Sequence, residues 1–274
     1  MAQDRPLNPA ELVSVLEWYR AAGVDVAVGE EPVNRFAQRP PARVAEAAIA
    51  RDTAPDSATR DEAAPVTTPA FATDPGEARS LAATAQSLAE LEAIVGAYDG
   101  CGLKLRATQL CFADGNPQAQ IMLIGEAPGA EEDRQGKPFV GKSGQLLDRM
   151  LSAIGLDRSK VYIANTVPWR PPGNRTPTPE ELAICLPFLH RQVELVAPKV
   201  ILTLGGPAMQ TVFNTSIGII KMRGRWSELA VGNHQVEAMP TLHPAYLLRN
   251  PAAKQQAWRD MLSLKQKIDA LGIA

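Results

Sequence analysis

Side chains that could take part in chemistry stand at the ends of three strand-like runs of this chain. Glu126 ends the run QIMLIGE, Asn165 lies near the end of VYIANT, and His243 directly follows VEAMPTL. A carboxylate can orient a water molecule, a side-chain amide offers both a donor and an acceptor, and an imidazole N–H can stabilise a developing negative charge. This set of residues predicts a polar binding site.

The elements that would position these residues alternate between strands and helices. Short apolar runs with strand composition occupy residues 120–126, 161–166, 200–205 and 236–242. Helical patterns lie between the runs, and one of them opens with the capping-box sequence TPEE. This alternation predicts a three-layer α/β/α sandwich around a central four-stranded parallel sheet. Ligands of parallel sheets bind beyond the carboxyl ends of the strands, where the candidate residues stand.

Composition divides the chain into three expected parts. Residues 1–35 predict an N-terminal helical segment, residues 36–80 a flexible linker rich in Ala and Pro, and residues 81–274 the α/β domain. Hydrophobic residues make up 45% of the chain, which supports a packed core, and the net charge of −2 leaves polyanion binding to local clusters of Lys and Arg. With three scattered cysteines, no signal sequence and no membrane-spanning run, the chain predicts a cytoplasmic protein.

The stretch GKPFVGKS at residues 136–143 matches the phosphate-loop pattern G-x-x-x-x-G-K-[ST] letter for letter. A phosphate loop requires a strand directly before its first glycine, but the preceding strand is expected to end near Glu126. Pro138 lacks a backbone N–H, and Phe139 is bulky where backbone amides should wrap a phosphate. The stretch therefore predicts another kind of site, whereas a nucleotide-binding protein would show ATP affinity that Lys142→Ala abolishes.

Four blocks of sequence carry a family resemblance. They are residues 125–147, 163–181, 221–224 and 242–251, with the sequences GEAPGAEEDRQGKPFVGKSGQLL, IANTVPWRPPGNRTPTPEE, KMRG and LHPAYLLRNP. In their order and their positions after successive strands, these blocks closely resemble the uracil-DNA glycosylase superfamily, and within it the bacterial and archaeal family 4 type. The resemblance covers about residues 98–270. It implies a DNA repair hydrolase that flips uracil out of DNA and cleaves its N-glycosidic bond, leaving an abasic site.

Roles for individual side chains follow from this resemblance. Glu126 would orient water and offset positive charge on the sugar, and Phe139 would stack on the extruded base. Asn165 would accept from uracil N3–H and donate to O4, a polarity that cytosine reverses. His243 would donate to uracil O2 as the base leaves, and Ala127 would contact the base. Strand-end capping by Asn165 and a solvated loop position for Glu126 are the structural alternatives.

The resemblance also implies further catalytic and DNA-binding positions. Asn174 aligns with an Asn near the catalytic water and Glu132 with a carboxylate beside the base, although Asn suits any Gly/Pro loop and the acidic run could be a solvated face. Clustered cations position phosphates, and a leucine of YLL could either wedge into the duplex or begin a packed helix. The expected DNA-binding residues are Lys142, Ser143, Lys221, Arg223, Leu247, Leu248 and Arg249.

The cysteines depart from the family pattern. The resemblance to family 4 implies an iron–sulfur cluster held by four cysteines. Here Tyr98 and Trp169 stand at two of the four positions, Cys101 and Cys185 remain, and Cys111 does not restore the spacing. We therefore expect no cluster, no other metal and no cofactor, with the two aromatic rings filling the space.

Catalytic turnover is favoured over two kinds of binding protein. One branch of the superfamily bonds covalently to uracil-DNA through a histidine in a basic loop, and the corresponding stretch RPPGNRTPTP contains no histidine. The alternative is a protein that binds uracil-containing or abasic DNA with little turnover. Release of free uracil distinguishes a glycosylase from such a binding protein. The expected partner is uracil-containing DNA and not a membrane. The expected protein is a nucleoid-associated monomer whose N-terminal helix could dock on the core or recruit a protein partner.

Overall fold

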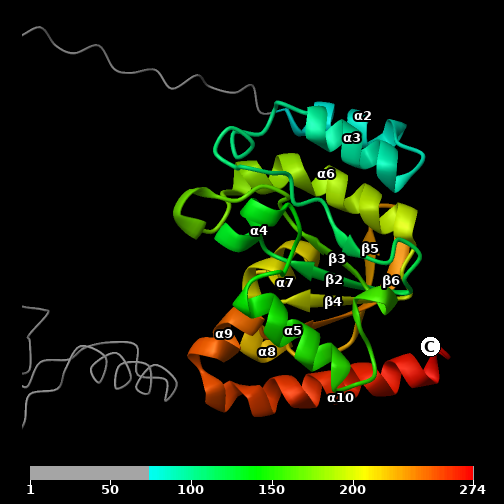
Figure 1. The fold of residues 1–274 in the computed structure, drawn as a ribbon. Coiled ribbons are helices and arrows are strands. Elements are labelled where there is room, and N and C mark those ends of the chain that lie inside the picture. The colour runs from blue at the N-terminus through cyan, green and yellow to red at the C-terminus, as the bar shows by residue number, and fades with distance from the viewer. Residues whose placement is uncertain (1–73, 274) are drawn as a thin grey trace, which may run out of the picture. The chain divides into compact units, whose positions relative to one another are not determined.

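The computed structural model of the protein describes residues 74–273. Within this range the chain folds around a six-stranded sheet with the strand order β1-β3-β2-β4-β6-β5 (Figure 1). The N-terminal helix expected in residues 1–35, and the linker expected up to residue 73, lie outside the range that the structure describes.

Four parallel strands form the centre of the sheet, as predicted. Two antiparallel edge strands, β1 beside β3 and β5 beside β6, make the sheet wider than expected. The two residues of β1 are too few to show a periodicity in the sequence. The strands are β1 (Asp114–Gly115), β2 (Ile121–Gly125), β3 (Tyr162–Asn165), β4 (Val200–Leu204), β5 (Ser227–Val231) and β6 (His234–Thr241).

Helices cover both faces of the sheet and complete the predicted three layers (Figure 1). Successive residues of β2 point to opposite faces. Ile121 and Leu123 pack on the side of α5 and α10, and Met122 and Ile124 pack on the side of α6. All four side chains are fully buried, so the hydrophobic core has two parts, one on each face of the sheet. These helices span Lys142–Ser152 (α5), Pro179–Val196 (α6) and Lys254–Ala270 (α10).

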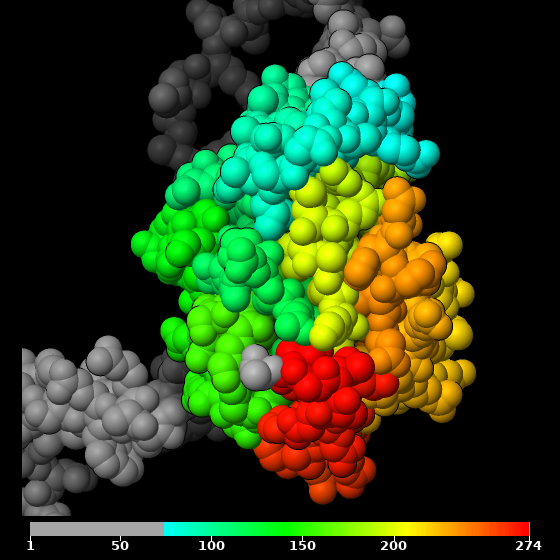
Figure 2. All heavy atoms as spheres, turned by 90° about the vertical axis from the view of Figure 1, so that its right-hand side faces the viewer, coloured from blue at the N-terminus to red at the C-terminus, as the bar shows by residue number. Residues whose placement is uncertain are grey.

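Two further helices, α2 (Pro75–Thr84) and α3 (Leu88–Ala97), pack on the α6 side, at the end of the molecule opposite α10 (Figure 2). Asp74 caps α2 by accepting the Gly76 N–H at 2.8 Å. The expected linker extended to residue 80, and this boundary is wrong, because α2 already begins at Pro75. Its small buried residues, such as Ala78, look like linker composition but allow close helix packing.

The capping box expected at the start of α6 is present. Thr178 Oγ1 accepts the Glu181 N–H at 3.3 Å, and the Glu181 carboxylate accepts the Thr178 N–H at 2.8 Å. No helix within residues 74–273 combines the length and the apolar character that a bilayer span requires. Shorter helices and turns complete the fold: α4 (Ala130–Gln135), α7 (Gly206–Val212), α8 (Ile219–Met222), α9 (Pro244–Arg249), η1 (Arg158–Lys160), η2 (Pro172–Asn174) and η3 (Pro251–Ala253).

Candidate active site

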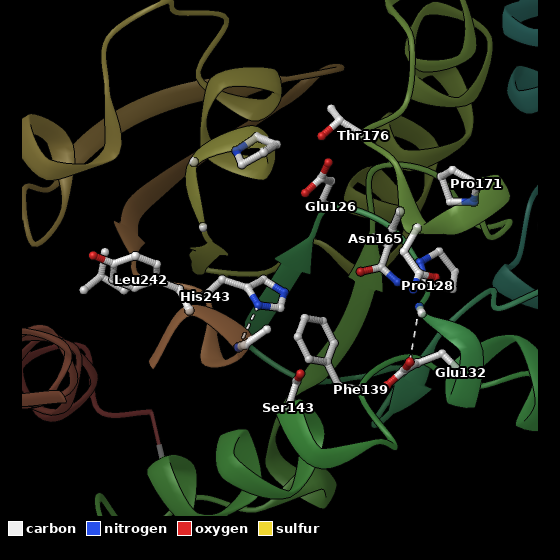
Figure 3. A pocket seen from close by; sticks show the side chains of 18 of the residues that line it. Glu126, Pro128, Glu132, Phe139, Ser143, Asn165, Pro171, Thr176, Leu242 and His243 are labelled. Atoms are coloured by element: carbon white, nitrogen blue, oxygen red, sulfur yellow. Dashed lines mark hydrogen bonds between the residues drawn. The ribbon is translucent and has the colours of Figure 1, made fainter. Parts of the chain in front are cut away.

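A pocket of about 680 Å³ lies at the carboxyl edge of the parallel strands (Figure 3). Glu126, Asn165 and His243 reach it from the ends of β2, β3 and β6, and Phe139 reaches it from the loop between α4 and α5. The fold therefore brings together the four side chains that distant parts of the sequence supply. Other expected site residues that line the pocket are Ala127, Glu132, Ser143, Asn174 and Arg249.

Asn165 presents a buried acceptor in this pocket. The residue is 5% exposed, and its Oδ1 atom has no hydrogen-bond partner within residues 74–273. Gly125 lies opposite it in the β2–β3 ladder and makes room for the amide, because a Cβ at that position would lie 2.4 Å from Asn165 Oδ1. An unpaired buried acceptor costs about 1–3 kcal/mol. Its position therefore indicates a binding site for a molecule that supplies a donor.

Phe139 is held in a strained backbone conformation. Its φ of 56° lies in the left-handed region, which costs a non-glycine residue roughly 1–3 kcal/mol. The ring is buried, and its centroid lies 5.5 Å from that of the His243 imidazole. Such strain persists only where the surrounding contacts maintain it, and it is common at ligand-binding positions.

Glu132 lines the pocket, but backbone amides occupy its carboxylate. Oε1 accepts the N–H groups of Val140 at 3.0 Å and Gly141 at 2.9 Å. Oε2 accepts that of Gly129 at 3.2 Å (Figure 3). These contacts favour a role for Glu132 in positioning the loop that follows Phe139. They do not favour the catalytic role beside the base that we expected from the sequence.

Glu126 is half-buried at the end of β2. Burial raises the pKa of its carboxyl above the ordinary value, and the Thr176 hydroxyl, which points toward it, partly offsets the rise (Figure 3). Its backbone is anchored, because the Thr166 hydroxyl donates to the Glu126 carbonyl at 2.6 Å. A partly desolvated carboxylate facing a pocket can accept a proton from water. Thr176 was not among the expected site residues, since a Thr-Pro pair in a loop carries no distinctive signal.

His243 is neutral at physiological pH. Burial lowers its pKa to about 4, and the nearby positive charge of Arg249 adds to the effect. Its Nδ1 atom accepts the Ala245 N–H at 3.0 Å, at the N-terminus of α9. We infer the tautomer from this contact: the single proton of the neutral ring lies on Nε2. His243 can therefore offer an N–H donor without carrying a full charge.

Asn174 lines the pocket from η2 and also has a left-handed backbone, with a φ of 56°. Its Oδ1 atom accepts from Arg170 Nε at 2.7 Å. Since the guanidinium holds the carbonyl end of this amide, the NH₂ end points to a donor role. Arg170 was not among the expected site residues.

Two of the expected DNA-binding residues are engaged within the fold: Leu247 is buried, so its prediction is wrong, and Arg223 is partly buried and paired. Leu247 is 1% exposed and packs against Ala257, so it begins a packed helix, which was the structural alternative. Arg223 forms an ion pair with Asp260 at 2.5 Å and also donates to the Gln256 carbonyl. The partners of both residues lie in α10, which follows them in the sequence, and these contacts favour a structural role.

The other expected DNA-binding residues lie on the surface or in the pocket. Lys142, Lys221, Leu248 and Arg249 are exposed, and Ser143 lines the pocket from the first turn of α5. The pocket also has an apolar rim that the sequence did not predict, because exposed and buried apolar residues look alike in a short helix. The missed rim residues are Ile219 and Ile220 of α8 and Tyr246 of α9.

The residues at the expected cluster positions do not fit an iron–sulfur cluster. Cys101 Sγ and Cys185 Sγ lie 3.8 Å apart, and both residues are buried in a core cluster that also contains Tyr98 and Trp169. Cys111 is engaged elsewhere, with its thiol donating to the Glu132 carbonyl at 3.1 Å. Within residues 74–273, no three His, Cys, Asp or Glu side chains are grouped so that they could hold a metal ion. Two thiolates are too few for a four-cysteine cluster.

Comparison with known proteins identifies the class. Residues 112–262, more than half of the chain, match the family described as the uracil DNA glycosylase superfamily. The mainly parallel sheet, the pocket at its carboxyl edge and this match agree, and the chain belongs to the uracil-DNA glycosylase superfamily.

Within the superfamily, the chain is similar to proteins named type-4 uracil-DNA glycosylase. The one from Thermotoga maritima is 45% identical over 151 residues, which cover 55% of this chain and 77% of the relative. The relative from Archaeoglobus fulgidus is 41% identical over 160 residues, covering 57% and 80%. That from Saccharolobus solfataricus is 40% identical over 164 residues, covering 57% and 75%. The family 4 resemblance is confirmed.

Proposed function

We propose that this protein is a uracil-DNA glycosylase, which removes uracil from DNA and leaves an abasic site for base excision repair. The observation that carries the proposal is the unpaired, buried Oδ1 acceptor of Asn165 in the pocket beside Phe139. Uracil offers an N3–H donor to such an acceptor, whereas cytosine has an acceptor at N3. The amide therefore supports selection of uracil over cytosine.

Binding requires the nucleotide to leave the duplex, because the bond to be cleaved is inaccessible within the base stack. Phe139 offers an aromatic face for the extruded base, with Asn165 at its Watson–Crick edge. The Gly125 position keeps this space open, because a side chain there would overlap both residues. Ala127 adds a small apolar contact at the pocket wall.

The chemical step breaks the bond between C1′ of deoxyribose and N1 of uracil. The electron pair leaves with the base, whose negative charge is shared with O2, and His243 Nε2–H stabilises this anion by donating to O2. Positive charge on the sugar is offset by the Glu126 carboxylate. Glu126 also accepts a proton from the water that bonds to C1′, and the Asn174 amide helps to hold that water.

DNA is held outside the pocket by cations and by small polar groups. Lys142, Lys221 and Arg249 are exposed and suit phosphate contacts, and Ser143 at the start of α5 can donate to a phosphate. Leu248, which is 41% exposed, is the residue that could fill the gap left in the duplex. We also propose the cytoplasmic, nucleoid-associated location expected from the sequence, because the proposed substrate is DNA.

We further propose that the protein works without an iron–sulfur cluster. Support comes from the packing of Tyr98 and Trp169 in the core beside Cys101 and Cys185, where the family pattern would need two more thiolates. No step of the proposed reaction uses a metal, since the pocket residues supply the donor, the acceptor and the carboxylate.

Excision of uracil from a synthetic oligonucleotide tests the function. The full-length protein should release free uracil and leave a strand that alkali cleaves at the abasic site. Asn165→Ala, Glu126→Gln and His243→Leu should each lower the rate while the protein stays folded. Tight binding of uracil-DNA without release would instead favour a binding protein with little turnover, and retention of full activity by all three variants would refute the assigned site.

A further inference from the structure

The loop that carries Phe139 is fixed by its backbone. It connects α4 to α5, and α5 packs so closely below it that a Cβ on Gly144 would lie 1.6 Å from the Phe139 carbonyl oxygen. On one side, the Glu132 carboxylate holds the N–H groups of the two residues after Phe139. The carbonyl groups of the same loop need a separate partner, because a carboxylate cannot donate to them.

Arg158 provides that partner from η1. Its guanidinium donates to the Pro138 carbonyl at 3.3 Å and to the Phe139 carbonyl. The same guanidinium forms ion pairs with Asp114 of β1 at 2.5 Å and with Asp148 of α5 at 2.8 Å. Two carboxylates therefore fix the plane of the guanidinium, and the fixed plane holds the two carbonyl groups.

We infer that Arg158 is a positioning residue for base stacking: it holds the left-handed Phe139 peptide so that the ring presents its face to the extruded uracil. This inference rests on the proposed glycosylase function. Arg158 lies outside the pocket lining, so it acts through Phe139 and does not contact the substrate. Lysine cannot replace it, because a single ammonium group cannot meet two carbonyls and two carboxylates in a plane.

A purely structural role is the competing explanation, since Arg158 also links β1 to α5. The two roles differ in how variants combine. If Arg158 acts through the ring, its effect disappears once the ring is removed; if it only supports the fold, its effect multiplies with that of Phe139→Ala. A double-mutant cycle in the uracil excision rate therefore separates them.

The experiment measures single-turnover uracil release by the full-length wild type, Arg158→Lys, Phe139→Ala and the double variant. Arg158→Lys should lower the rate about 10- to 100-fold, because displacing a positioned group by about 1 Å has effects of this size. The double variant should match Phe139→Ala within about twofold. Hydrogen exchange should accelerate at the Val140 and Gly141 amides of Arg158→Lys.

Arg191→Lys is the matched control. Arg191 is 22% exposed, against 25% for Arg158, and it likewise joins a carboxylate, Glu194, to a backbone carbonyl, that of Ala85, away from the pocket. Its replacement should leave the excision rate within about twofold of wild type. If circular dichroism shows that Arg158→Lys does not fold, Asp114→Asn takes its place in the cycle. This variant removes one of the two ion pairs that hold the Arg158 guanidinium.

The outcomes separate this inference from the function. A wild type that releases no uracil refutes the proposed function and the positioning role with it. If the wild type is active but the excision rate of Arg158→Lys, or of Asp114→Asn in its place, stays within about twofold of the wild-type rate, the positioning role is refuted and the proposed function is not. Multiplied effects in the double variant also refute it, as does an equal loss in Arg191→Lys.

Discussion

Replacing Gly125 by alanine should displace two side chains of the proposed uracil site. The added Cβ would lie 2.4 Å from Asn165 Oδ1 and 2.6 Å from Phe139 Cζ. Ordinary contacts begin at 3.4 Å, so the amide oxygen must retreat by about 1 Å and the ring by slightly less. Both groups belong to the proposed uracil site, and both would move away from the positions that hold the base.

The size of the effect follows from this displacement. A shift of about 1 Å in a positioning group costs roughly 100-fold in rate, which equals about 2.7 kcal/mol of transition-state stabilisation. The crowded strand should also destabilise the fold by about 1–3 kcal/mol, as overpacking does in other cores. Excision must therefore be assayed well below the melting temperature, with folding checked by circular dichroism.

Gly96→Ala is the control for adding a methyl group. Gly96 lies in α3, and among residues 74–273 a Cβ there would meet only Leu110 Cδ2 at 3.8 Å, an ordinary contact. This variant should keep full excision activity and gain up to about 1 kcal/mol of stability, since alanine favours helix. A folded Gly125→Ala protein that excises uracil within about twofold of the wild-type rate would refute the proposed arrangement of the site.

Three further predictions concern charge, metal and DNA contacts. Between pH 6.5 and about 4, His243 is protonated in the unfolded chain but not in the folded protein, so the free energy of unfolding should decrease as the pH falls. Urea titrations at pH 7 and pH 5 should show a smaller decrease for His243→Gln than for the wild type. Cys101→Ala/Cys185→Ala should retain excision within about tenfold, because packing alone explains both thiols; stoichiometric iron in protein prepared under anaerobic conditions would contradict this. Lys221→Ala and Arg249→Ala should each reduce the slope of log binding constant against log salt concentration by about 1, and an unchanged slope would exclude that residue from phosphate contact.

The sequence reveals the parts of the site that depend on strand ends. Asn165 and His243 follow apolar runs whose composition marks them as strands, and parallel strands place their carboxyl ends at one edge. The four central strands were predictable for the same reason. The strained φ of Phe139 was not, because nothing in a Gly- and Pro-rich loop distinguishes a left-handed phenylalanine from an extended one.

Residues that depend on a distant partner could not be assigned from the sequence. Arg223 looks like a free cation in KMRGRW, but its partner Asp260 lies 37 residues later. Leu247 and Leu248 are adjacent and identical in type, and only the packing of α10 buries one and leaves the other exposed. The start of α2 was missed because its alanines pack against α6, which is an interaction that composition does not show.

The centre of the sheet leaves room for the side chains that form the pocket. Gly125 follows the apolar run of β2, and Gly205 follows β4, where a Cβ would lie 2.9 Å from the His243 Cβ. Any replacement of either glycine adds atoms that would crowd Asn165 and Phe139 or His243. The two glycines are therefore as much a part of the site as the side chains that they make room for, although neither carries a functional group.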